Sequence, residues 1–159
     1  MKIRSVRSDP RRRAFLVRTA RGVYEFPWTQ LDVVPSAADP VVAVYPDPEL
    51  AREAFTYRLA SGAEDAVPLD QVRWFVRDPD YLREELLFTL TAEALEAVRT
   101  SGRSKRSLAR QLGTSLAQIA RLLDTTNYRK SVDQMVRLLG SLGCRLEPRI
   151  VKARVSRAG

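Results

Sequence analysis

The sequence predicts an α+β protein, in which a small β-hairpin-rich N-terminal domain precedes an all-α domain. Up to residue 76, short β-branched and aromatic runs alternate with Gly-containing turns, a pattern typical of hairpins. After residue 80, apolar residues recur at three- and four-residue steps, as in amphipathic helices. The charge changes at the same place. Residues 1–80 carry 12 Lys/Arg and 12 Asp/Glu, whereas residues 81–159 carry 15 and 7.

Two hairpins are predicted in the N-terminal domain. The turn of the first hairpin is flanked by residues 14–18 and 23–26. The turn of the second is flanked by residues 55–59 and 66–69. The hairpins are alike, since Ala-Phe-x-x-Arg-x-Ala-x-Gly begins at Ala14 and again forty residues later. The likeness predicts a pseudo-symmetric sheet made of two hairpins, with chance agreement as the competing explanation.

The ends of these domains follow from changes in composition. Residues 1–12 are basic and without a period, which predicts a flexible lead-in, and the proline in residues 78–80 favours the start of a long helix ending near Arg99. Residues 145–151 are strand-like, and the proline among them suits an edge strand. We therefore expect a β-rich partner-binding or dimerisation domain over residues 1–79, a helical domain over 80–145, and a strand-like segment with a basic tail over 146–159.

Composition excludes several kinds of site. The chain has no histidine and its only cysteine is Cys144, so a His/Cys metal centre and a Ser-His or Cys-His nucleophile are ruled out by count. We expect no enzyme activity, metal or cofactor. A single cysteine fits a reducing cytoplasm, and no apolar run is long enough for a signal peptide or membrane span. The net charge of +8 favours a polyanionic partner, either nucleic acid or an anionic membrane surface.

The most informative segment is residues 104–123, SKRSLARQLGTSLAQIARLL. Leu108, Ala109 and Leu112 form the apolar stripe of a short helix, and Gly113 follows where a helix end needs a positive φ. Ser115 is an N-cap for a second helix with an apolar inner face. The small Ala109 lets two such helices cross closely.

This segment resembles the helix-turn-helix of the Cro/lambda-repressor-like (xenobiotic-response-element, XRE) regulators. The matching residues are Leu108-Ala109, Gly113, Ser115 and Ile119, and the resemblance extends over about residues 80–145. It implies a lambda-repressor-like helix-turn-helix domain that binds double-stranded DNA. The second helix, Ser115 to Leu123, would lie in the major groove and the first across the backbone.

The resemblance also implies which side chains meet DNA. The expected base-reading residues are Leu116, Ala117, Gln118 and Arg121, because Gln pairs with adenine, Arg with guanine, and apolar groups with thymine methyls. The expected phosphate contacts are Lys105, Arg106, Ser115, Thr126, Asn127, Arg129 and Lys130.

Three functions remain open from the sequence. The first is a transcriptional regulator, most simply a repressor, that binds near-palindromic sites as a homodimer. The second is an antitoxin that binds a cognate toxin through its N-terminal half and autoregulates its operon. The third is a chromosome-structuring protein that binds DNA with little sequence preference.

Overall fold

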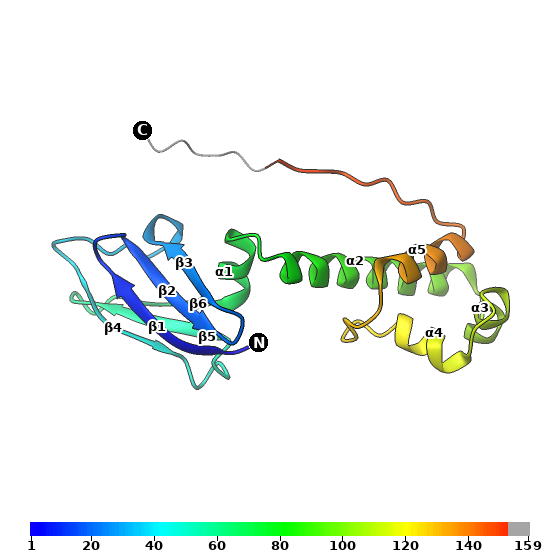
Figure 1. Cartoon of the computed structure of the whole chain (residues 1–159), viewed down its shortest axis with the longest axis horizontal. Helices are drawn as coiled ribbons and strands as arrows, with labels where there is room; N and C mark the ends of the chain where they lie inside the picture. The colour runs from blue at the N-terminus through cyan, green and yellow to red at the C-terminus, as the bar shows by residue number, and fades with distance from the viewer. Residues whose placement is uncertain (153–159) are drawn as a thin grey trace. The chain divides into compact units, whose positions relative to one another are not determined.

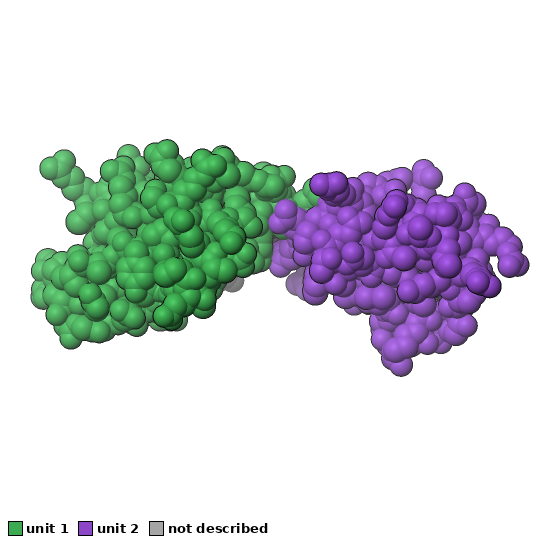
Figure 2. Space-filling model, turned by 90° about the horizontal axis from the view of Figure 1, so that it is seen from below, with its two compact units in different colours: residues 1–83 green, residues 84–159 purple. Residues whose placement is uncertain are grey.

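The computed structural model describes residues 1–152 and divides into two compact units. The first is Met1–Arg83 and the second begins at Glu84, as the two colours of Figure 2 show. The boundary falls inside a long helix, four residues beyond the position expected from the sequence.

The first unit contains two antiparallel three-stranded sheets (Figure 1). Sheet A has the strand order β1 (Ile3–Asp9), β2 (Ala14–Thr19), β3 (Val23–Pro27), and sheet B the order β4 (Val41–Pro46), β5 (Ala54–Leu59), β6 (Glu64–Pro68). A single 3-10 turn (Trp28–Gln30) follows β3, and helix α1 (Leu69–Phe75) follows β6.

The two sheets repeat one pattern of backbone and burial. Strands β2 and β5 share the same sequence of buried and exposed positions, and β1 and β4 each carry an irregularity one residue after they begin. Asp9 and Asp47 occupy the same place in both repeats, where one carboxylate oxygen accepts two backbone N–H groups of the following turn. The repeat predicted from the sequence is therefore present in the fold.

Aromatic side chains from both sheets fill the core between them. Phe15 of sheet A lies with its ring centroid 5.0 Å from those of Phe55 and Tyr57 of sheet B. All three are fully buried, and Val72 of α1 belongs to the same cluster. The two sheets thus share one core through their inner faces, so their outer faces point away from each other.

The structure corrects the predicted fold class. The two hairpins form as expected, but residues 3–9 are a strand rather than a flexible lead-in, and residues 41–46 add a third strand to the second hairpin. Residues 69–75, read from the sequence as β structure, are helix α1. The first unit is therefore a two-sheet structure with a helix, and not a pair of hairpins.

A buried ionic cluster closes one end of the first unit. The Asp78 carboxylate accepts hydrogen bonds from the Tyr24 hydroxyl (2.5 Å), the Arg73 guanidinium (3.3 Å) and the Tyr81 backbone N–H (2.9 Å). The Arg73 guanidinium carbon also lies 5.0 Å from the Tyr81 ring centroid. Burial alone would raise the pKa of Asp78, but these donors outweigh it and hold the pKa below its ordinary value.

Within the described residues, the regular secondary structure of the second unit is all helical. Its elements are the continuation of α2 (Pro79–Ser101), then α3 (Lys105–Gln111), α4 (Leu116–Leu122) and α5 (Val132–Ser141). Leu87 and Ala94 of α2 pack with Leu108, Ile119 and Leu138 in one buried cluster. The long helix matches the expectation from its leucine spacing.

The segment after α5 differs from its prediction. Residues 145–151, expected to be an edge strand, have no regular secondary structure. Most of the expected basic tail lies beyond the described residues. Every helix within residues 1–152 is too short or too polar to cross a membrane.

Candidate nucleic-acid interface

Helices α3 and α4 are joined by a tight turn whose geometry follows from the local sequence. Gly113 has φ +62°, which an L side chain rarely adopts, and the Thr114 N–H donates to the Ala109 carbonyl (2.9 Å). The hydroxyl of Ser104 caps α3 and that of Ser115 caps α4, each accepting a backbone N–H at 3.1 Å. The Ser115 cap and the glycine turn were predicted.

Burial divides α4 into two faces. Ile119 and Leu122 face the core of the second unit and are at most 5% exposed. Leu116 is 46% exposed, and Ala117, Ala120 and Arg121 are exposed as well. An exposed leucine beside two alanines leaves room for another surface to approach the helix closely.

The predicted base-reading residues lie on or beside this outer face. Leu116, Ala117 and Arg121 are on it, while Gln118 is half-buried at its margin. Ala120 also belongs to the face and was not predicted, although its spacing of three from Ala117 and four from Leu116 indicates it.

Exposed cations lie on α3, on α4 and on the loop after α4. Within residues 1–152, five exposed Lys/Arg side chains near α4 have neither a carboxylate partner nor a side-chain hydrogen bond, namely Lys105, Arg106, Arg110, Arg121 and Arg129. Four of them were predicted. Arg110 was missed as a contact residue, although it follows Arg106 by four positions and so shares its helix face.

Other cations of the same region are engaged within the protein. Arg99 pairs with Glu96, and Arg137 lies 3.2 Å from the Asp133 carboxylate. The Arg103 guanidinium donates to the Ser141 carbonyl and to Gln111. These arginines already have partners within the protein, so fewer cations are available to a polyanionic partner than the sequence suggests.

The loop after α4 uses its polar side chains to hold its own shape. The Asp124 carboxylate accepts from the Thr126 backbone N–H (2.9 Å) and hydroxyl (2.7 Å), and these bonds lower the pKa of Asp124. The Asn127 amide donates to the Arg121 carbonyl (3.1 Å) and accepts from the Arg129 N–H (3.1 Å). Thr126 and Asn127, predicted as phosphate contacts, thus order the loop that presents Arg129.

Lys130 is not placed as the sequence predicts. Its side chain is only 4% exposed, and its ammonium group donates to the carbonyls of Leu122 (2.8 Å) and Asp124 (2.7 Å). The first of these carbonyls ends α4, where helix carbonyls lack helical partners, and the second lies two residues beyond the helix. Burial lowers the pKa of Lys130, opposed by the nearby Asp124. We correct its role from phosphate contact to C-terminal cap of α4.

Comparison of the chain with protein-family models, curated proteins and solved structures finds no match. The resemblance to Cro/lambda-repressor-like regulators thus rests on the motif alone. Because no solved structure matches, the predicted fold class is corrected to α+β alone, without a lambda-repressor-like domain.

Proposed function

We propose that the second unit binds double-stranded DNA through α4 and that the protein is a sequence-specific transcriptional regulator, acting as a repressor. The observation that carries the proposal is the group of five exposed, unpaired cations around an outer helix face of leucine and alanine. DNA presents a dense row of phosphates beside a groove wide enough to admit one helix.

The charge balance supports a polyanionic partner. Residues 102–131 contain seven Lys/Arg and one carboxylate, Asp124, whose oxygen already accepts from Thr126. Residues 1–80 are neutral as a whole. The positive charge is therefore concentrated at helices α3 and α4. An anionic membrane surface has no groove that admits a helix, whereas the major groove of DNA does, and this favours DNA as the partner of α4.

The chemistry of α4 suits the major groove. Arg121 can donate two hydrogen bonds to guanine, and Leu116 with Ala117 can contact thymine methyl groups. Lys105 and Arg106 on α3, together with Arg129 on the following loop, then meet phosphates on either side. In helix-turn-helix proteins the second helix of such a pair has this orientation.

One such helix reads only a few base pairs, so we propose a homodimer as the DNA-binding species. Two copies would present their α4 helices to half-sites about one helical turn apart. Footprinting on a selected site should show two protected half-sites. Protection of a single half-site by a monomer would refute the dimer.

The function is tested by selecting bound duplexes from a random pool and measuring affinity by fluorescence anisotropy. The slope of log K against log salt should be about −0.9 for each phosphate contact. Arg121→Gln should reduce discrimination between the selected site and random DNA by about 1–3 kcal/mol. The matched control is Arg137→Gln, since Arg137 is exposed but paired with Asp133.

The outcomes separate the alternatives. No enrichment of any sequence, with salt-dependent binding retained, would overturn the sequence-specific proposal and favour a low-specificity DNA-binding protein. Absence of binding to any duplex, or equal effects of the Arg121 and Arg137 substitutions, would overturn the assignment of α4.

A further inference from the structure

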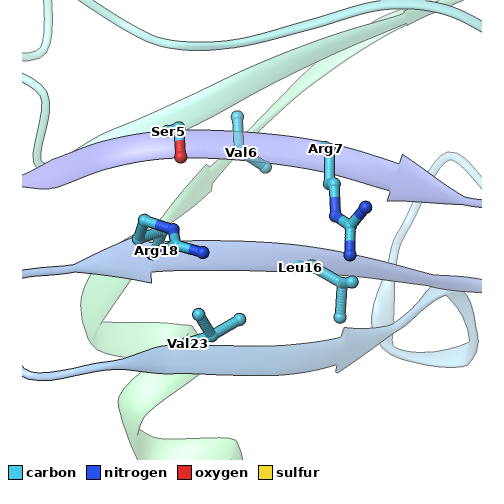
Figure 3. Close-up of a pocket in the computed structure, with 6 residues that line it drawn as sticks. All are labelled: Ser5, Val6, Arg7, Leu16, Arg18 and Val23. Carbon is cyan, nitrogen blue, oxygen red and sulfur yellow. The ribbon is translucent and has the colours of Figure 1, made fainter.

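The outer face of sheet A carries a groove that DNA binding by the second unit does not use. It has a volume of about 460 Å³ and is lined by Ser5, Val6, Arg7, Leu16, Arg18 and Val23 (Figure 3). Arg7 and Arg18 both extend over the sheet there. Neither arginine has a carboxylate or hydrogen-bond partner within residues 1–152.

The strand register fixes the spacing of the two arginines. Arg7 of β1 is opposite Leu16 of β2, and Arg18 is opposite Ser5, so the arginines are diagonal neighbours. Diagonal positions of an antiparallel pair are about 7–8 Å apart. Alternate residues of an extended peptide are separated by about 6.6–6.8 Å and point to the same side. Two carboxylates at alternate positions of such a peptide therefore match the two guanidinium groups.

The groove also has an apolar part. Val23 is 51% exposed on β3, directly opposite Arg18, and the largely buried Leu16 lies on β2 opposite Arg7. Glu25, the acidic residue across from Leu16, is already paired with Arg12 at 2.9 Å. No acidic side chain of sheet A remains to neutralise Arg7 and Arg18, since the other one, Asp9, holds the β1–β2 turn.

The internal repeat shows that this surface is not a consequence of the fold. In sheet B, Tyr45 occupies the position equivalent to Arg7, and Thr56 the position equivalent to Leu16. Arg58 is equivalent to Arg18, but the residue opposite it is Glu64 and not a valine. Residues 1–31 carry eight Lys/Arg and two Asp/Glu, whereas residues 32–80 carry four and ten. The combination of two arginines with an exposed valine is therefore found in sheet A and not at the equivalent positions of sheet B.

We propose that this groove binds an acidic, extended segment of a partner protein, with carboxylates at alternate positions on Arg7 and Arg18 and an apolar side chain on Val23. Bidentate pairing with carboxylates is the contact that guanidinium groups make best. A second copy of the chain fits less well. The outer face of sheet B places Glu64 opposite Arg58 and so offers no row of free carboxylates. Because the outer faces of the two sheets point in opposite directions, pairing sheet A with sheet B of a second copy would also be head-to-tail and would not give a closed dimer.

The inference is independent of DNA binding by α4 and is tested on the full chain by NMR. The probe is an acetylated and amidated peptide, Glu-Thr-Glu-Thr-Val, which places both carboxylates and the valine on one side when extended. It should shift amide signals of β1, β2 and β3 at millimolar concentration. The peptide with lysine in place of both glutamates should not.

Substitutions locate the site. Arg7→Gln and Arg18→Gln should each weaken peptide binding about two- to fivefold, the range for a surface ion pair. Arg58→Gln is the matched control, because it removes one positive charge from the equivalent position of sheet B. Equal weakening by Arg58→Gln, or no shifts in sheet A, would overturn the proposal. So would equal affinity for succinate, or stronger binding of duplex DNA to the same amides.

Discussion

Replacing Lys130 with methionine should destabilise the helical unit while leaving the salt dependence of DNA binding unchanged. The ammonium group makes two hydrogen bonds, 2.8 and 2.7 Å long, to the carbonyl of Leu122 at the end of α4 and to that of Asp124 just after it. Hydrogen bonds from a charged donor contribute about 1.5–3 kcal/mol each, but methionine also removes the cost of burying the charge. What remains is the loss from two carbonyls without a donor, about 1–3 kcal/mol for each and so about 2–6 kcal/mol in total.

Thermal unfolding measured by circular dichroism checks this value. For a domain of this size, 1 kcal/mol corresponds to about 4–8 °C in Tm. The matched control is Arg129→Gln at the neighbouring position, which is exposed and has no partner to lose within the described residues. It should leave the Tm unchanged and reduce the salt slope of DNA binding by about 0.9.

Lys130→Met is thus expected to lower only the Tm, and Arg129→Gln to lower only the salt slope. If Lys130→Met reduced the salt slope by about 0.9 and left the Tm unchanged, Lys130 would be a phosphate contact. The argument from its burial and its two carbonyl acceptors would then be wrong.

Two further predictions concern the turn of the helical unit and the ionic cluster of the first unit. Gly113→Ala should lower the free energy of unfolding by about 1–2 kcal/mol because φ is +62° there, whereas Gly140→Ala, inside α5 with open space around it, should raise it by about 0.5–1 kcal/mol. Urea unfolding checks both, and equal losses would refute the role of φ. Because the pKa of Asp78 is lowered in the folded protein, its contribution to stability is complete above its ordinary value of 3.8 and is lost as the pH falls through the folded value. The stability difference between the wild type and Asp78→Asn should therefore shrink from pH 7 to pH 3, and an unchanged difference would contradict the cluster.

The elements that the sequence predicted are those with an uninterrupted period or a specific cap. Leucines at three- and four-residue steps identified α2, and Ser115 after Gly113 identified the start of α4. Strands β1 and β4 were missed because each has an irregularity near its beginning, after Ile3 and after Val41. Such a bulge breaks the alternation by which a strand is recognised.

The contact residues were less predictable because sequence shows charge but not its partner. Arg129 and Lys130 are adjacent cations, yet one is exposed and the other holds two carbonyls. Lys130 directly precedes the N-cap Ser131 of α5, a position that often packs inward. Its hydrocarbon stem can fill that position while the ammonium group reaches the end of α4.

The internal repeat separates what the fold requires from what is free to differ. Inward positions must fill the shared core, and Phe15 and Phe55 meet there with their ring centroids 5.0 Å apart. Outward positions have no such constraint. There, Tyr45 is the counterpart of Arg7 in the second repeat, and Glu64 is the counterpart of Val23. Because both repeats pair their strands in the same way, this difference cannot be assigned to backbone geometry. If sheet A binds the proposed acidic segment, substitutions on its outer face should alter that binding without disturbing the core.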